Sequence, residues 1–333
     1  MFCPIYPNLD HLLQLLAVYH HIFLWIGLPV LSVSLPFYIF FFTRFWWAVV
    51  VYFVWFLYDF DTPRRGSRNW AWYKNATIWK HFSDYFPIRL VKTVELSPNR
   101  NYILGCHPHG VFSVGAFVHL CTSATGFGQL FPGLKSNILT LNGQFWFPFR
   151  REIGMGLGGV ESSSRSLKFL LSNPGRGRLI GIVIGGAEEV LDAHPGQHHL
   201  NILGRRGFCR FALKTGTSLL PSYSFGENDL FDQYPNSRGS RLRTIQSSIK
   251  RKCGFCIPFI NGCCGFCDHF GLLPRRRPIT TVIGAPIEVK RIGKPTPDQV
   301  ELLHSHYCNE LDKLFEEHKT KYGVPNDVHL TFH

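Results

Sequence analysis

Residues 102–110 read Tyr-Ile-Leu-Gly-Cys-His-Pro-His-Gly. An apolar run over residues 102–106 is typical of a strand that is buried on both faces. His107 and His109 follow it, and Pro108 between them restricts His107 to an extended backbone. The imidazole is the side chain whose ordinary pKa suits proton transfer near neutral pH. The pattern is therefore typical of a base at a strand end, and a surface turn or a partial metal site is the alternative.

Further apolar runs, bounded by glycine or proline, lie on either side of this stretch along the chain. They predict strands over residues 179–184, 219–225 and 279–283. Helices are predicted over residues 163–171 and 208–215, and a long one with Thr296 as N-cap follows near the C-terminus. Strands that alternate with helices indicate an α/β layered architecture with a mostly buried sheet.

A second polar motif, Gly185-Gly186-Ala187-Glu188-Glu189, comes directly after one of these predicted strands. A carboxylate at a strand end can orient an imidazole from a neighbouring strand and stabilise its charge. Acidic residues are also common in the first turn of a helix, where the helix dipole favours them. The residues of this motif alone leave both interpretations open.

The start of the chain is unlike the rest of its 333 residues, which are 45% hydrophobic and only 17% charged overall. Between His11 and Tyr58 the one formal charge is Arg44, so the net charge of +13 lies almost wholly later. Residues 22–43 are uncharged and about 33 Å long as a helix, enough to cross a hydrocarbon core of about 30 Å. Residues 45–58 reach only about 21 Å. We therefore expect a membrane-anchoring helical hairpin over residues 1–58, and a core hairpin of a soluble protein is the alternative.

The second unit is a basic body over residues 59–333. Four basic side chains follow the hairpin directly: Arg64, Arg65, Arg68 and Lys74. By the positive-inside rule they hold the body on the cytosolic side of the membrane. The ten cysteines then lie in a reducing compartment, where a disulfide framework is not expected.

Four cysteines near the C-terminal third invite comparison with a zinc site, because Cys253-x-x-Cys256 and Cys264-x-x-Cys267 lie close together. The seven residues between the pairs are fewer than in common double-knuckle sites. We therefore expect that these cysteines bind no metal and that their thiols are buried or face the membrane.

Several motifs together resemble the family of type 2 acyl-CoA:diacylglycerol acyltransferases and monoacylglycerol acyltransferases, over nearly the whole chain. They are Tyr85-Phe86-Pro87, His107-Pro108-His109-Gly110, Gly185-Gly186-Ala187 with Glu189, Arg206-Gly207-Phe208 with Arg210, Phe225-Gly226-Glu227-Asn228 and Pro278-Ile279-Thr280-Thr281-Val282. Residues 191–196 and 228–233 look most like the monoacylglycerol branch. Cys106, residues 150–154 and residues 261–265 depart from the family pattern.

The resemblance implies an acyltransferase-type α/β domain that moves a fatty acyl group from acyl-CoA to a glyceride hydroxyl. His107, His109 and Glu189 match the family's site positions, with Pro108, Gly110, Gly185 and Gly186 in support. An alcohol is a poor nucleophile, so an imidazole must take its proton as it attacks the thioester. We expect His109 to be this base and His107 to be an orienter or donor, with the reverse assignment left open. Glu189 is expected to pair with the histidines.

The resemblance also implies the partners and the location. Acyl-CoA is a substrate, no cofactor is expected, and the acceptor is monoacylglycerol, with diacylglycerol or a long-chain alcohol as alternatives. Arg205, Arg206, Arg210 and Lys214 could hold the CoA phosphates or anionic lipid headgroups. The expected location is the endoplasmic reticulum membrane, with lipid droplets as a further site, and nucleic acid is not an expected partner. Self-association stays open, and a non-catalytic lipid-binding scaffold is the alternative from another class.

Overall fold

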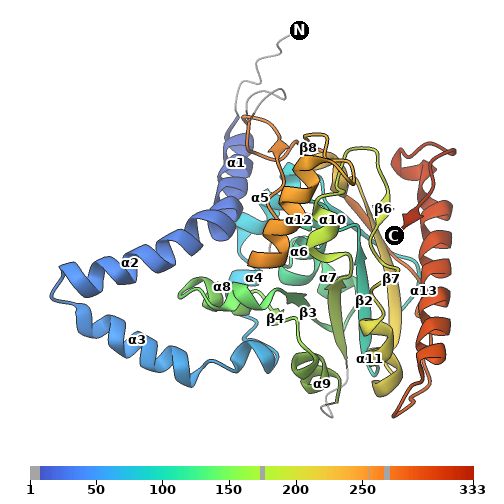
Figure 1. Cartoon of the computed structure of the whole chain (residues 1–333), viewed down its shortest axis with the longest axis horizontal. Helices are drawn as coiled ribbons and strands as arrows, with labels where there is room; N and C mark the ends of the chain where they lie inside the picture. Colours follow the sequence, from blue (N-terminus) through green and yellow to red (C-terminus); the bar gives the residue numbers. More distant parts are fainter. Residues whose placement is uncertain (1–7, 173–176, 255, 266–270) are drawn as a thin grey trace, which may run out of the picture.

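The body is built around one seven-stranded sheet, of which β2, β3, β4 and β7 are labelled in Figure 1. The structure is a computed structural model, and it describes residues 8–172, 177–254, 256–265 and 271–333. The strand order is β1-β10-β7-β2-β5-β3-β4. β2, β3, β4, β5 and β7 run parallel, whereas β10 and β1 run the other way. Their bounds are β1 Arg89–Lys92, β2 Tyr102–His107, β3 Lys135–Thr140, β4 Gly159–Glu161, β5 Arg178–Val183, β7 Ser218–Phe225 and β10 Thr280–Ile283.

Helices cover both faces of this sheet. On one face the apolar sides of α9 (Ser164–Ser172), α11 (Gly207–Thr215) and α13 (Pro297–His318) share a core with the strands. On the other face lie α1 (Leu9–Ile22), α5 (Thr77–Tyr85) and α6 (Val114–Cys121). The expected α/β class with a mostly buried sheet is confirmed, since β2 and β7 are buried along their whole length.

Further elements complete the chain. These helices are α4 Ala71–Lys74, α7 Phe127–Leu130, α8 Arg150–Gly156, α10 Gly186–Val190 and α12 Arg241–Cys253. Two-residue strands pair outside the main sheet, as β6 His199–Leu200 with β11 Thr331–Phe332 and β8 Asp232–Gln233 with β9 Ile260–Asn261. The expected cap of the last long helix is also present, because Thr296 and Gln299 form a capping box at the start of α13.

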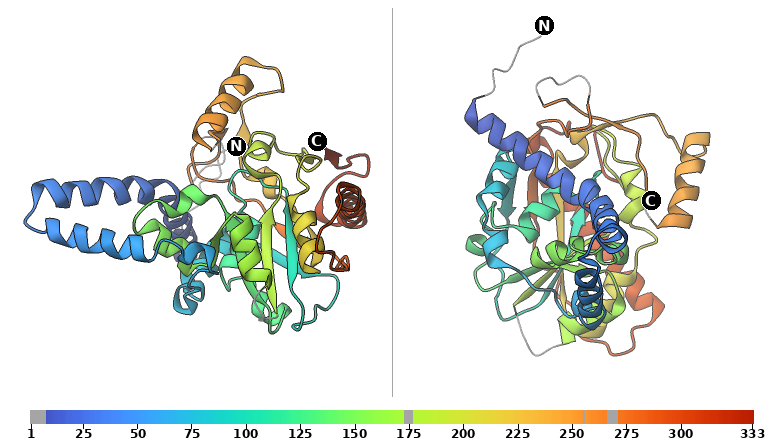
Figure 2. Two further views of the ribbon diagram at one scale, coloured as in Figure 1. Left: turned by 60° about the horizontal axis from the view of Figure 1, so that its bottom comes forward. Right: turned by 90° about the vertical axis from the view of Figure 1, so that its left-hand side faces the viewer.

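The N-terminal helices form a hairpin that projects from the body, as Figures 1 and 2 show. α1 continues through a π-helical turn, Phe23–Gly27, into α2 (Leu28–Phe42), and α3 (Trp46–Tyr58) returns beside α2. The helix from Leu9 to Phe42 is long and apolar enough to cross a membrane. The chain changes direction at the π-helical turn, just before Pro29, where such turns and prolines bend helices.

The projecting hairpin is shorter than the expected segment of residues 1–58. α1 does not project, because Leu15 and Val18 pack against Trp79 and Phe82 of α5 in the core of the body. In contrast, α2 and α3 carry exposed apolar side chains along their length, such as Phe41, which is 63% exposed. A surface of this kind is typical of a segment that contacts lipid.

Candidate active site

The histidine motif lies where the sequence analysis placed it, at the carboxyl end of the central strand β2. β2 sits between β5 and β7, and all three run parallel. The residues that follow these strands therefore meet at one edge of the sheet. Residues 185–189 follow β5, and residues 226–227 follow β7. The motif is thus flanked on both sides by a segment that carries glycine and a carboxylate.

His107 is completely buried, and its ring contacts the C-terminal helix. Its Nε2 lies 3.1 Å from the hydroxyl of Tyr307 on α13. Gly105 makes this approach possible, because a Cβ at that position would stand 1.9 Å from the Tyr307 oxygen. Burial lowers the pKa of His107 to about 3, so the ring is neutral. Its Nδ1 is buried and has no hydrogen-bond partner among the described residues.

His109 is partly exposed, and its contacts fix the proton on its ring. Its Nδ1 lies 3.0 Å from the carbonyl oxygen of Gly110, which can only accept. The hydroxyl of Ser113 donates to the His109 carbonyl at 2.9 Å and lies near the same ring nitrogen. Burial lowers the pKa of His109, which favours the neutral ring. A neutral ring with its proton on Nδ1 has a lone pair on Nε2, and no hydrogen bond reaches that atom within the described ranges.

Glu189 contacts the backbone of the motif, not an imidazole, and here the expected pairing was wrong. One carboxylate oxygen accepts the backbone N–H of His109 at 2.5 Å, and the other accepts the N–H of Asn201 at 2.9 Å. Both oxygens are thus used, and the side chain is 2% exposed. Gly185 leaves the space for it, because a Cβ there would stand 1.9 Å from a carboxylate oxygen of Glu189. Burial raises the pKa of Glu189 to about 7.

Glu227 holds the other side of the same loop. Its carboxylate oxygens accept the N–H groups of Val114 and Gly115, at 2.6 and 2.8 Å, at the start of α6. Gly110 packs directly on it, since a Cβ there would lie 2.7 Å from Glu227 Cγ. Burial raises the pKa of Glu227 to about 7 as well. The sequence analysis gave Glu227 no role, although it follows a buried strand and a glycine as Glu189 does.

The basic cluster at the start of α11 is only partly brought to the site. Arg205 lies nearest, with a guanidinium nitrogen 3.4 Å from the carbonyl oxygen of Gly185, close to the positive-φ Gly186. Arg206 is occupied by an ion pair with Glu301 of α13. Arg210 and Lys214 are exposed further along the helix, and neither forms an ion pair within the described part of the chain.

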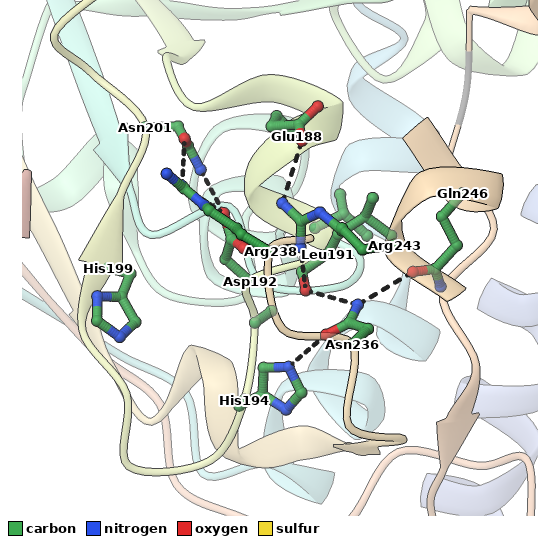
Figure 3. A network of polar contacts seen from close by, with 12 residues as sticks. Glu188, Leu191, Asp192, His194, His199, Asn201, Asn236, Arg238, Arg243 and Gln246 are labelled. Atoms are coloured by element: carbon green, nitrogen blue, oxygen red, sulfur yellow. Dashed lines mark hydrogen bonds and ion pairs between the residues drawn. The ribbon is translucent and has the colours of Figure 1, made fainter. Parts of the chain in front are cut away.

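Glu188, next to Glu189 in the chain, lies in an ion-pair network. Figure 3 shows Arg243 of α12 placed between Glu188, at 3.1 Å, and Asp192, at 2.7 Å. Lys250 also pairs with Glu188, and Asn201 donates to Asp192 at 2.6 Å. Burial opposes ionisation of Glu188, but hydrogen bonds from Lys250 and Arg243 outweigh it and lower its pKa. The two adjacent carboxylates therefore face different partners, Glu188 the helix α12 and Glu189 the histidine loop.

The cysteine cluster forms no metal site among the residues that the structure describes. Within those residues no group of three or more histidine, cysteine and acidic side chains could hold a metal ion. Cys267 and His269 lie outside the described residues. Cys256 instead contacts the carbonyl oxygen of Ala187, and buried Cys263 contacts that of Pro274.

Comparisons with known proteins agree in pointing to one family. The family model for diacylglycerol acyltransferase matches residues 38–333. The chain is 43% identical to 2-acylglycerol O-acyltransferase 1 of Bos taurus over 99% of this chain and 98% of that protein. It is 47% identical to the Mus musculus protein of the same name, over 87% and 86% of the two chains.

The chain is also similar to a protein with a different name and, weakly, to one solved structure. Diacylglycerol O-acyltransferase 2 of Danio rerio is 42% identical over 96% of this chain and 89% of that protein. Among solved structures, the 1-acyl-sn-glycerophosphate acyltransferase of Thermotoga maritima aligns with a TM-score of 0.41 at 13% identity, covering 93% of this chain and 98% of that one.

Proposed function

Because the chain belongs to the diacylglycerol acyltransferase family, we propose that it transfers a fatty acyl group from acyl-CoA to monoacylglycerol and forms diacylglycerol. The chain is an acyltransferase of glycerolipid synthesis. The choice of monoacylglycerol is supported by the relatives named 2-acylglycerol O-acyltransferase 1, which match it at 43–47% identity. No metal or cofactor takes part in the reaction that we propose.

One observation carries the mechanism: His109 Nε2 is the nitrogen that holds a lone pair, because Nδ1 faces the Gly110 carbonyl. The acceptor hydroxyl gives its proton to His109 Nε2 while its oxygen attacks the thioester carbonyl carbon. The tetrahedral oxyanion then collapses, the carbon–sulfur bond breaks, and the CoA sulfur takes the proton from the imidazolium. No covalent acyl-enzyme is formed.

His107 and Tyr307 support the oxyanion in this proposal. Burial holds the pKa of Tyr307 well above its ordinary value, so the phenol is protonated. When its hydroxyl donates to His107 Nε2, the proton of the neutral imidazole lies on Nδ1. That buried nitrogen has no partner among the described residues, and it can donate to the developing charge. Tyr307 is then a positioning residue.

The two buried carboxylates, Glu189 and Glu227, act as positioning residues for the loop between β2 and α6. Each accepts two backbone N–H groups, and together they fix the loop from both sides of β2. Such charge-assisted hydrogen bonds are stronger than neutral ones. They hold the His109 ring in one place, and a fast proton transfer requires such a fixed orientation.

The acyl-CoA and the membrane lie on opposite sides of this site in our proposal. Arg205, Arg210 and Lys214 give a positive surface for the CoA phosphates, with Arg205 beside the glycine turn after β5. α2 and α3 insert into the endoplasmic reticulum membrane, and the basic residues after them keep the body on the cytosolic side. We place the boundary between hairpin and body near residue 58, with α1 as part of the body. Protease added outside sealed microsomes should then digest the body.

The experiment that tests this function compares acceptors. The purified full chain in lipid nanodiscs receives radiolabelled acyl-CoA with monoacylglycerol, diacylglycerol or a long-chain alcohol, and kcat/KM is measured for each. The proposal expects the highest kcat/KM for monoacylglycerol. A higher value for diacylglycerol or the alcohol would replace the acceptor, and no turnover with any of them would favour a lipid-binding scaffold.

A further inference from the structure

The carboxylate of Glu189 depends on a later segment of the chain for one of its two contacts. One oxygen holds the N–H of His109, and the other holds the N–H of Asn201, which comes just after β6. Glu189 is 2% exposed, so a lost contact would leave a buried polar atom without a partner. The position of the Asn201 backbone therefore bears directly on the carboxylate that holds the histidine loop.

The side chain of Asn201 is held by Asp192, three residues after Glu189 in the chain. Asn201 Nδ2 donates to Asp192 Oδ2 at 2.6 Å, as Figure 3 shows. The other end of the amide, Oδ1, accepts from the guanidinium of Arg238 at 3.1 Å, and these two contacts fix which way the amide faces. Asn201 is thus bound twice to the same short segment, by its backbone to Glu189 and by its side chain to Asp192.

Arg243 of α12 holds Asp192 in turn. Its Nη1 lies 2.7 Å from Asp192 Oδ1, so the two oxygens of Asp192 have separate donors. The side chains of Arg243 and Asp192 are 6% and 12% exposed, and the planar guanidinium donates in fixed directions. A continuous series of hydrogen bonds and one ion pair therefore leads from α12 to the backbone of the histidine loop.

We propose that Asp192 and Asn201 are positioning residues for the acyl transfer. Their hydrogen bond keeps the Asn201 N–H on Glu189, and Glu189 in turn holds the loop that carries His109. The inference rests on the proposed function and adds two residues that act through Glu189. Glu188 also pairs with Arg243, but its carboxylate lies outside this series.

Swapping the two side chains tests the contact between them. In Asp192→Asn the new amide keeps its oxygen toward Arg243 and turns its NH2 group toward that of Asn201, so two donors meet. In Asn201→Asp two carboxylates meet. In the double variant, the amide at position 192 can donate to the carboxylate at position 201, which also accepts from Arg238. The swap therefore restores the contact that each single variant loses.

The kinetic result expected is a loss in kcat that the swap repairs. Each single variant should lower kcat for diacylglycerol formation by about three- to tenfold, less than a change in Glu189 itself, because it displaces the loop through one further contact. Both KM values should stay unchanged, since neither side chain is a proposed substrate contact. The double variant should regain the wild-type kcat. Glu188→Gln is the matched control, because it also removes a carboxylate from Arg243, and it should keep its kcat.

Amide hydrogen exchange separates failure of this inference from failure of the proposed function. In nanodiscs, the peptide that carries His109 should exchange about three- to tenfold faster in each single variant and at the wild-type rate in the double variant and in Glu188→Gln. This measurement decides the inference even if the wild type converts no acceptor. If the double variant does not fold, Asp192→Asn against Glu188→Gln decides it. Folded single variants with a wild-type exchange rate, or with a wild-type kcat in an active enzyme, overturn the inference, as does a folded double variant that is not repaired.

Discussion

At the residue scale, the two histidines of the site differ in what their free nitrogens can do. His109 is partly exposed and presents a lone pair on Nε2, because the Gly110 carbonyl holds the proton on Nδ1. His107 is fully buried, has its Nε2 at Tyr307 and leaves Nδ1 without a partner among the described residues. The pair thus offers one acceptor and one donor, which an acyl transfer to a hydroxyl requires.

Tyr307→Phe tests the contact that gives His107 this form. The variant keeps the ring against Gly105 but loses the hydroxyl, so the proton of His107 is no longer held on Nδ1. We expect kcat to fall by about 10- to 100-fold, somewhat less than the loss of an oxyanion donor itself, with both KM values unchanged. Steady-state kinetics in detergent measure this.

Tyr102→Phe is the control for that variant. Tyr102 is a buried tyrosine of β2, the strand that carries His107, and its hydroxyl donates to the Ser97 carbonyl at 3.2 Å. It should lose some stability and keep its kcat. Equal kcat values for the two variants would remove Tyr307 from the mechanism.

The raised pKa of Glu227 predicts that the stability of the protein depends on pH. Its folded pKa of about 7 exceeds the ordinary value of 4.5, so between these pH values the folded protein binds more protons than the unfolded chain. Stability therefore falls as pH rises through this window, by up to about 3 kcal/mol for this group at about 1.4 kcal/mol per pH unit. In Glu227→Gln this contribution is absent, so the free energy of unfolding should fall less between pH 5 and pH 8.

Chemical denaturation of both proteins across that range measures the two slopes. Glu188→Gln serves as the opposite case. The pKa of Glu188 is lowered, so the stability that this group contributes is lost as pH falls, not as pH rises. Parallel slopes for wild type and Glu227→Gln would show that the buried carboxylate does not titrate as described.

At the element scale, the short helix α10 divides two neighbouring carboxylates between two tasks. Glu189 points to the histidine loop, and Glu188 pairs with Arg243 and Lys250 of α12. Figure 3 shows Glu188 of α10 paired with Arg243 of α12. Adjacent positions on a helix point in different directions, so one residue acts on the site and the other on the fold around it.

This division predicts unequal losses from two matched substitutions. In Glu189→Gln the carbonyl oxygen can still accept one N–H, but the NH2 group cannot accept, so one buried N–H of His109 or Asn201 is left without a partner and the loop shifts. We expect kcat to fall by about 10- to 100-fold, as small misplacement of a reacting group causes. Glu188→Gln loses partly exposed ion pairs, so stability should fall by about 1 kcal/mol or less and kcat should remain. A larger kcat loss in Glu188→Gln would reject the assignment.

The main elements of the fold could be predicted from sequence, since apolar runs bounded by glycine or proline mark β2, β5, β7 and β10. The position of His107 and His109 at a strand end followed directly. The edge strand β1 and the polar helix α12 were not predicted, because few of their side chains are fully buried and their sequences carry little hydrophobic pattern.

The contacts within the site were harder to predict than its location. Tyr307 fits the apolar face of α13, and nothing in that periodicity shows that its hydroxyl reaches a strand 200 residues away. The Glu189 carboxylate was expected at an imidazole, but the course of the loop after β2 brings the backbone N–H of His109 to it instead. Such contacts depend on how separate elements pack, which local patterns do not encode.

At the scale of the whole molecule, an α/β body carries a projecting hairpin, α2 and α3, whose apolar side chains are exposed, and the histidine loop after β2 belongs to the body. Arg205 contacts the turn after β5, and α11 packs on the face of the sheet opposite to α1. In our proposal, acyl-CoA approaches the histidine loop from the side of α11.

Charged substitutions in the hairpin test its contact with the membrane. Phe41→Asp with Val54→Asp places acids on side chains that are 63% and 64% exposed, so the fold of the body should not change. Each acid in the hydrocarbon core costs about 2.5–3.5 kcal/mol on insertion scales. The variant should be released from membranes by an alkaline carbonate wash that retains the wild type.

Leu302→Asp is the control for those changes, because Leu302 is 74% exposed on α13 of the body. It should stay in the membrane fraction. If the hairpin variant is retained as well as this control, α2 and α3 are not the anchor.

The central claim is that His109 takes the proton of the acceptor hydroxyl. The most direct measurement is kcat for diacylglycerol formation from acyl-CoA and monoacylglycerol by purified wild type, His109→Ala and His306→Ala, the last being an exposed histidine of α13. We predict a fall of about 10²- to 10⁴-fold in His109→Ala, with an unchanged melting temperature and a normal kcat in His306→Ala. Near-normal turnover by folded His109→Ala would contradict the account and move the base to another residue.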